Sequence, residues 1–137
     1  MRRFAALLLA NEIVGPDLFV LRFADCGPLL GAEAGQFVML RGPGGTDPLL
    51  PRAFSILRTT PAGELELLVK AVGKATRRLA AARPGERYDL LGPLGSHFPA
   101  RRSGERCLLV AGGVGLAPLL FFLDRAAVVR NPRERRR

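Results

Sequence analysis

The sequence predicts a mainly β protein: a six-stranded antiparallel barrel with one short helix, followed by the first strand and helix of an α/β domain. Residues 1–95 read as short apolar runs separated by glycine and proline turn signals, which is typical of a small sandwich or barrel. One segment between the fifth and sixth runs has helical spacing instead. After residue 105 the apolar residues become continuous, and glycines follow them. A closed barrel is favoured because closure removes exposed strand edges.

Six strands are expected, each bounded by turn residues. The run DLFVLRFAD is apolar on both faces, as in a largely buried strand, and ELELLVKAV alternates clearly. Pro51 opens the fourth run, at a position where a strand tolerates proline. The expected ranges are 3–14, 17–25, 36–42, 51–58, 64–72 and 86–95.

Helical spacing appears twice. Residues 73–85 begin at a glycine, place alanine and leucine at helical intervals, and stop at Pro84-Gly85, so a short helix is expected. The run 105–113 has no alternation and predicts a parallel strand covered on both faces. Residues 113–129 then predict a helix opened by glycines. Together these two segments form the first βα unit of a nucleotide-binding domain. The expected division is a barrel over 1–100 and an incomplete βα segment with a basic tail over 101–137.

Composition narrows the functional classes. The 137 residues are 48% hydrophobic, which suffices for a packed core, and no apolar run approaches the roughly 18 residues of a membrane span. The start, MRRFAALLLANEIV, reads as a strand and not as a signal peptide, because polar residues follow at once and no cleavage site appears. Cys26 and Cys107 have neither metal-ligand nor disulfide-framework spacing, so a reduced cytoplasmic protein is expected.

The net charge of +9 raises the question of nucleic acid, but its distribution argues against it. Much of the excess lies at Arg101, Arg102 and Arg106 and in the tail RNPRERRR, which reads as a solvated end. The chain has no tryptophan and one tyrosine, so no stacking platform for bases is evident. His97, the single histidine, is expected in an exposed loop without a catalytic role.

Three motifs could hold phosphate, and each has a simpler reading. AGGVGLAP (111–118) could turn the backbone toward an anion at a helix start, but Pro118 replaces the third glycine of the dinucleotide pattern. An ordinary strand-to-helix turn is the alternative. RAFS (52–55) could aim an arginine at an anion or simply at solvent. VGKAT (72–76) could bind phosphate or be a plain helix N-cap.

The order of these motifs is more specific than any one of them. A barrel strand with Arg-x-x-Ser, a Gly-x-x-Thr helix start, Gly-Pro-x-Gly and Gly-Gly-x-Gly-x-x-Pro resembles the ferredoxin-reductase-like flavoproteins. Within them, GQFVMLR, DPLLPRAFSI, VGKAT, LLGPLGSHF and LLVAGGVGLAPL are similar to the electron-transfer subunits of dihydroorotate dehydrogenase. The resemblance runs from about Asn11 to Leu120. It implies an FAD-binding barrel followed by an NAD-binding domain, and a late cysteine cluster that holds a [2Fe–2S] centre.

The resemblance assigns cofactor roles to positions in this chain. Arg52 would pair with an FAD phosphate, and Ala53, Phe54 and Ser55 would line the flavin. The residues that would run beside the cofactor are Leu68, Val69 and Lys70. Those that would hold its pyrophosphate are Gly73, Ala75 and Thr76. The glycines that would face the nicotinamide nucleotide are Gly112, Gly113 and Gly115.

The chain departs from the family pattern in several places. Phe54 stands where tyrosine is frequent, Ala53 replaces a proline, and Ala75 replaces a glycine. Two cysteines cannot ligate an iron–sulfur centre that needs four thiolates, so [2Fe–2S] is not expected here. NAD is expected to bind only if the rest of its domain is supplied.

The expected function is that of an FAD-binding electron-transfer subunit, or its flavin domain, which moves electrons between a dehydrogenase partner and NAD. In the family the partner is the catalytic dihydroorotate dehydrogenase subunit, in pyrimidine biosynthesis, and the chain is not expected to be active alone. The alternatives are another flavin reductase of this superfamily and a cofactor-free interaction module. The apolar helix after residue 113 is expected to drive self-association, as a dimer.

Overall fold

The computed structural model describes residues 1–43, 50–100 and 106–130, with residues 127–130 described by their backbone only. The basic tail after Arg130 lies outside the described residues. The strands are β1 (Arg2–Gly15), β2 (Leu18–Ala24), β3 (Phe37–Arg41), β4 (Arg52–Thr59), β5 (Leu65–Lys70) and β6 (Arg87–Leu94). The helices are α1 (Lys74–Ala80) and α2 (Leu116–Arg130), with 3-10 turns η1 (Gly27–Leu29) and η2 (Gly113–Gly115).

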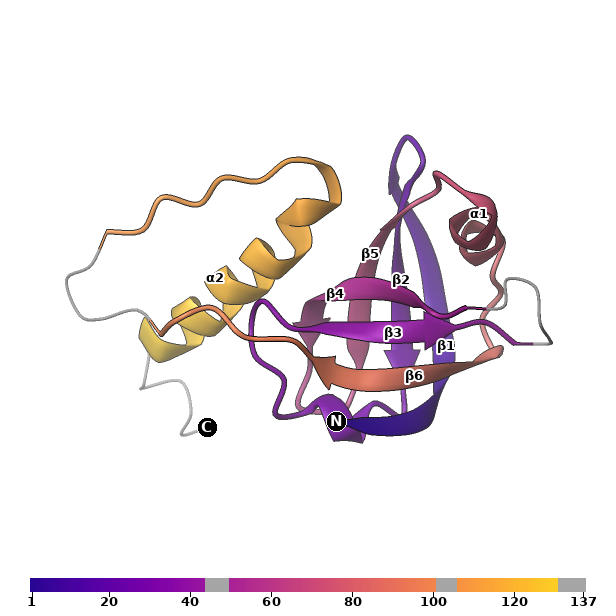
Figure 1. Cartoon of the computed structure of the whole chain (residues 1–137), viewed down its shortest axis with the longest axis horizontal. Coiled ribbons are helices and arrows are strands. Elements are labelled where there is room, and N and C mark those ends of the chain that lie inside the picture. Colours follow the sequence, from indigo (N-terminus) through magenta and orange to yellow (C-terminus); the bar gives the residue numbers. More distant parts are fainter. Residues whose placement is uncertain (44–49, 101–105, 131–137) are drawn as a thin grey trace.

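The six strands close into one antiparallel barrel in the order β1-β2-β5-β4-β3-β6. In Figure 1, β4, β3 and β6 lie side by side and cross the direction of β5, β2 and β1. The predicted barrel and its six strands are therefore confirmed, with end-points that differ by one or two residues. The helix predicted over 73–85 is also present, but α1 ends at Ala80, before Pro84.

The barrel interior is apolar and packs tightly. Strands β2 and β5 bury every second residue, as their alternation predicts, and Phe23 meets Tyr88 edge-on at 5.5 Å between ring centroids. Gly92 of β6 has no room for a side chain, since a Cβ there would lie 2.7 Å from Val38 Cγ1. The first three residues of the Gly-Pro-x-Gly stretch, 92–94, belong to β6.

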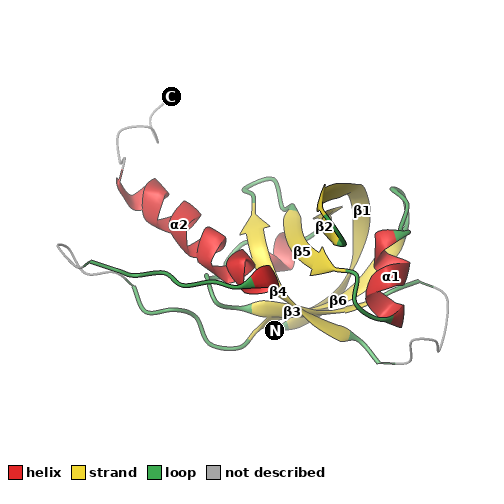
Figure 2. Cartoon of the chain, turned by 90° about the horizontal axis from the view of Figure 1, so that it is seen from above, coloured by secondary structure: helices red, strands yellow, loops and turns green. Residues whose placement is uncertain are grey.

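Helix α2 docks on the barrel beside β4 (Figures 1 and 2). Its Phe121 is 1% exposed and joins the barrel core. Around this anchor, Arg58 Nε donates to Asp124 Oδ2 at 2.7 Å, and Arg125 donates to the Ala32 carbonyl at 2.8 Å. The hydrogen bond to Asp124 raises the pKa of Arg58 above its ordinary value. Apolar burial and two hydrogen bonds thus fix the helix to the barrel, one to β4 and one to the connection before β3.

The strand predicted over 105–113 is wrong for its described part. Residues 106–112 have no regular secondary structure, and Leu108 and Val110 are 89% and 80% exposed. A parallel strand must be paired by neighbours and covered on both faces. The described chain places no strand beside this segment, so its backbone has no ladder to join. The helix that follows is confirmed, as η2 and α2.

No described helix is long and apolar enough to cross a membrane. His97 is exposed, as predicted, and its Nε2 lies 3.2 Å from Glu33 Oε2. Glu33 lies in the connection between η1 and β3, whereas His97 lies in the connection between the barrel and α2. Phe98 in the same connection packs edge-on against Phe122 of α2.

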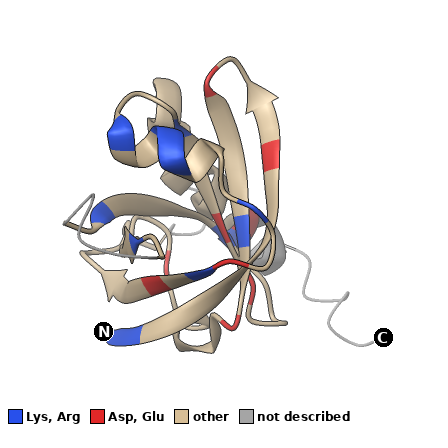
Figure 3. Ribbon diagram, turned by 90° about the vertical axis from the view of Figure 1, so that its right-hand side faces the viewer, with Lys and Arg blue, Asp and Glu red and all other residues tan. Residues whose placement is uncertain are grey.

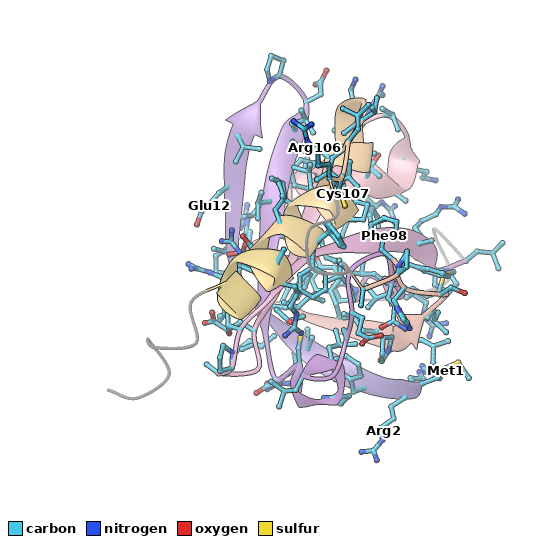
Figure 4. All side chains as sticks on the ribbon, turned by 90° about the vertical axis from the view of Figure 1, so that its left-hand side faces the viewer. Met1, Arg2, Glu12, Phe98, Arg106 and Cys107 are labelled. Atoms are coloured by element: carbon cyan, nitrogen blue, oxygen red, sulfur yellow. The ribbon has the colours of Figure 1, made fainter. Side chains whose placement is uncertain are left out.

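The two cysteines occupy opposite environments. Cys26 is 1% exposed within the core, whereas Cys107 is exposed on the segment before α2 and stands beside Arg106 (Figure 4). Burial, with a further contribution from the charge of Asp25, raises the pKa of Cys26 from 9.0 to about 12. The thiolate is the reactive form, so Cys26 is shielded both by packing and by protonation.

We expect Phe121→Ala to lower the free energy of unfolding by about 3–5 kcal/mol, because it removes a buried ring from the core. Chemical denaturation followed by circular dichroism measures this change. Leu123→Ala, at a half-exposed position on the same helix, is the matched control and should have a much smaller effect. Equal losses for the two variants would contradict the docking of α2.

Thiol labelling at pH 8 should modify Cys107 rapidly and Cys26 only after unfolding. Because the folded pKa of Cys26 is raised, this group favours the folded state below pH 9.0, and that contribution disappears between pH 9.0 and about 12. A chromogenic disulfide reagent with and without guanidinium counts the thiols. Rapid reaction of both cysteines in the native protein would contradict the burial of Cys26.

Candidate functional site

The barrel wall opens along one seam, between β4 and β5. Their ladder runs only from Ile56–Leu67 to Thr59–Leu65, with a register shift inside it. The preceding part of β4 pairs with β3, and the last part of β5 pairs with β2, but within the described chain these two parts do not pair with each other. Alternate residues of a strand direct both backbone polar groups to the same side. The seam therefore presents backbone donors and acceptors that the sheet does not use.

The predicted flavin-lining residues lie along this seam. Residues 53–55 belong to β4 and residues 68–70 to β5. Phe54 and Ser55 are half-buried, and the Phe54 ring packs on the core from its edge. Val69 differs from its prediction in one respect, because its side chain is 1% exposed inside the barrel. Only the backbone of Val69 can therefore reach a ligand in the seam.

A pocket of about 150 Å³ adjoins the start of β4. It is formed by the ends of β3 and β4, the inner face of α1 and the start of β6. Arg52 and Ala75 both line it, so the structure brings together two predicted phosphate-binding positions that are far apart in sequence. The side chain of Arg52 makes no hydrogen bond or ion pair with the described residues. The pocket is lined by Leu40, Arg41, Gly42, Pro43, Leu50, Arg52, Ala75, Arg78, Leu79, Glu86 and Tyr88.

Hydrogen bonds at both ends hold α1 against this pocket. Thr76 Oγ1 accepts from the backbone N–H groups of Val72 and Gly73, each at 3.0 Å, and donates to the Gly73 carbonyl at 3.1 Å. At the other end, Asn11 Nδ2 donates to the carbonyls of Leu79, Ala80 and Ala82 at 3.0–3.2 Å. The Thr76 hydroxyl thus organises the turn before the helix from the third helical position, and Gly73 is the N-cap residue. A Cβ at Gly73 would meet open space.

The pocket is electrically asymmetric. Three arginines, Arg41, Arg52 and Arg78, are among its lining residues, and Figure 3 shows the basic residues of α1 in blue. Glu86 and Tyr88 lie at the β6 side, where the Tyr88 hydroxyl donates to Glu86 Oε2 at 2.8 Å. Burial, aided by this hydrogen bond, raises the pKa of Tyr88, so its hydroxyl stays a donor. An anion is favoured at the arginine side and disfavoured beside Glu86.

The glycine turn before α2 approaches the seam from another direction. Turn η2 contacts β5, and Gly113 has a φ of +55°, in the left-handed region that favours glycine. Gly112, Gly113 and Gly115 are all exposed, and a Cβ on any of them would meet open space. The three predicted nicotinamide-facing glycines therefore stand at a free surface near the strand that borders the seam.

Several site residues escaped the sequence analysis. Arg78 lies three positions after Ala75, so the helical period could have placed both on one face. Arg41 carries a weaker signal, as a charged residue at the end of an apolar strand. Glu86, Tyr88 and Asn11 have no local signal, because their roles depend on which strands meet α1.

The arrangement has two features that suit a dinucleotide cofactor. No group of three or more potential ligands from His, Cys, Asp and Glu comes together among the described residues. Guanidinium groups recognise phosphate through paired N–H donors. The seam offers a second kind of recognition, because its free backbone groups complement a planar ring with carbonyl and N–H edges. Both features lie on β4, with Arg52 at the pocket and Ser55 at the seam.

Curated relatives share this sequence over most of its length. The electron transfer subunit of dihydroorotate dehydrogenase B (NAD(+)) from Desulforamulus reducens is 38% identical over 93% of this chain. The subunit of that name from Bacillus velezensis is 46% identical over 64% of it. The chain spans 49% and 35% of these two relatives, which is half their length or less.

Solved structures share the fold. The Amycolatopsis cytochrome P450 reductase GcoB is 31% identical, with a TM-score of 0.77 over 96% of this chain and 40% of its own. The ferredoxin reductase in carbazole 1,9a-dioxygenase is 25% identical, with a TM-score of 0.79 over 93% of this chain and 40% of its own. The family model for the oxidoreductase FAD-binding domain matches residues 5–98, which include the whole barrel after the first residues of β1. The chain therefore belongs to the oxidoreductase FAD-binding domain family.

Proposed function

We propose that the chain binds FAD with its ring system against the β4–β5 seam and its diphosphate in the Arg52 pocket. The observation that carries this proposal is the continuity of the two features along β4. Arg52 lines the pocket, and the next residues, 53–55, border the seam. A ligand with a planar ring at one end and phosphates at the other would contact both.

The protein's share is to hold and orient the cofactor, and FAD supplies the electron-transfer chemistry when bound. In this proposal Arg52 pairs with a phosphate, and Ala53, Phe54 and Ser55 line the ring. The remaining predicted contacts follow the same path: Leu68 and Lys70 by side chain or backbone, Val69 by backbone, Gly73 and Ala75 beside the diphosphate, and Thr76 through the turn that it organises. Residues 1–100 would form the FAD-binding unit.

We further propose that the chain belongs to an electron-transfer subunit that works with a catalytic dihydroorotate dehydrogenase in the cytoplasm. Support comes from the names of the relatives from Desulforamulus reducens and Bacillus velezensis. Gly112, Gly113 and Gly115 would face the nicotinamide nucleotide, with the rest of that site supplied by further polypeptide. The similarity to GcoB supports a second candidate, a flavin reductase that serves another electron acceptor.

Purified protein should show flavin absorption bands, or acquire them on addition of FAD. Arg52→Gln should weaken FAD binding about 10–100-fold, because a charge-assisted hydrogen bond to phosphate is lost. Arg83→Gln removes the same charge from an exposed position outside the pocket and should leave binding unchanged. Titration of apoprotein with FAD, followed by flavin fluorescence, measures both. Protein that stays colourless with excess FAD would refute the proposal.

We also propose that the chain self-associates through the apolar surface around α2. Leu108 and Val110 are almost fully exposed, and Val114, Leu116 and Leu123 add further exposed apolar area along the same stretch of chain. Exposed apolar side chains that are contiguous in this way are typical of association surfaces. A second copy of the chain can cover this surface with the same residues, as two-fold symmetry requires.

Light scattering at tens of micromolar, roughly the range in which weak interfaces populate, should give the mass of a dimer. The double variant Leu108→Asp, Val110→Asp should give a monomer, because it places charges on the proposed interface. Ile13→Asp changes an equally exposed apolar residue of the β1–β2 hairpin and should leave the dimer intact. A monomeric wild-type protein would overturn the self-association.

A further inference from the structure

The pocket that Arg52 lines also contains another basic residue, Arg78, which belongs to none of the sequence motifs. Arg78 lines the pocket from α1 together with Arg52 from β4 and Ala75 from the same helix. It lies three residues after Ala75, which places it on the same helical face about one turn further along. Its neighbour Arg77 does not line the pocket, although both arginines are exposed.

Arg52 and Arg78, two of the three arginines that line the pocket, differ in their distance along the chain from the seam. Arg52 immediately precedes the residues 53–55 that border the seam. Arg78 lies on α1, which lines the pocket but is not one of the two strands that form the seam. A ligand that lies along the seam and continues into the pocket therefore meets Arg52 first and Arg78 second.

Each arginine can serve a separate phosphate group. A guanidinium has five N–H donors in a planar fork, which suits paired contacts with phosphate oxygens. Arg78 already interacts within the folded chain, and five donors leave capacity for a phosphate as well. Glu86, held by the Tyr88 hydroxyl at 2.8 Å, disfavours phosphate on the β6 side and so confines the anion to the arginines.

We infer that Arg78 selects FAD over FMN by contacting the part of the diphosphate that FMN lacks. The inference rests on the proposed function, because it presumes that the flavin ring lies in the seam. FMN ends in a single phosphate, which Arg52 can engage. FAD continues through a second phosphate to adenosine, and Arg78 meets this continuation. Arg52 then supports both flavins, whereas Arg78 supports FAD alone.

The test compares dissociation constants of FAD and FMN for apoprotein, with Arg78→Gln set against Arg77→Gln. Both variants remove one positive charge from adjacent positions of α1, so they change the general electrostatics of the helix equally. Arg78→Gln should weaken FAD about tenfold or more, as expected for a charge-assisted hydrogen bond, and leave FMN within about twofold. Arg77→Gln should leave both constants unchanged. Flavin fluorescence gives all four constants without any assay of activity.

A second variant keeps the test decisive if Arg78→Gln does not fold. Arg78→Lys retains the charge without the planar fork and should lose part of the FAD affinity while FMN binding stays constant. Equal FAD affinities for the Arg78 and Arg77 variants would overturn the inference, as would an equal loss of FAD and FMN. In both cases the proposed function would survive, because the wild-type protein would still bind flavin. Wild-type protein that binds neither flavin would overturn both.

Discussion

The candidate site depends on where the β4–β5 ladder stops. Pairing ends at Ile56 and Leu67, after a register shift, and the Ile56 N–H is instead donated to the Gln36 carbonyl. A shift of this kind adds twist and bends a strand away from its partner. Because β3 holds the rest of β4 and β2 holds the rest of β5, the seam can open without loss of the barrel. Had the ladder continued to Arg52, the sheet would have used the backbone groups that the seam leaves available.

Strand β4 consequently contributes to three features: the pocket, the seam and the contact with α2. The start of β4 places Arg52 at the pocket, its middle borders the seam, and its end carries Arg58, which binds Asp124 of α2. Burial of Phe121 in the core gives this helix its anchor. The docking of α2 also determines where the glycine turn η2 lies, since the turn leads directly into the helix and contacts β5. Strand β4 thus borders the pocket and the seam, and it anchors the helix whose preceding glycine turn contacts β5.

Sequence reasoning succeeded where a local pattern carries the physical cause. Alternation over 17–25 and 64–72 predicted strands because one face of each must be buried. Pro84-Gly85 predicted that the preceding helix ends before the proline, because a helix cannot continue through proline. The prediction failed for residues 105–113, where a continuous apolar run predicted a strand buried on both faces. Burial of such a run requires neighbouring strands, and the described chain has none beside Leu108 and Val110. A continuous apolar run is stable as a strand only when neighbouring elements bury it, and the run itself does not provide those neighbours.

The sequence by itself determined the types and order of most elements, the family resemblance, and the prediction that Arg52 meets a phosphate, because these follow from periodicity, turn chemistry and motif order. Only the tertiary structure decided which side chains lie at the pocket and at the seam. It turned Val69 into the core, set Arg78 in the pocket while Arg77 stayed outside, and brought Asn11 from the first strand to the end of α1. Such assignments depend on which face of an element is buried, and that is settled by contacts between residues far apart in the chain. The opening between β4 and β5 has the same origin, since it arises from how six strands close and from no single stretch of sequence.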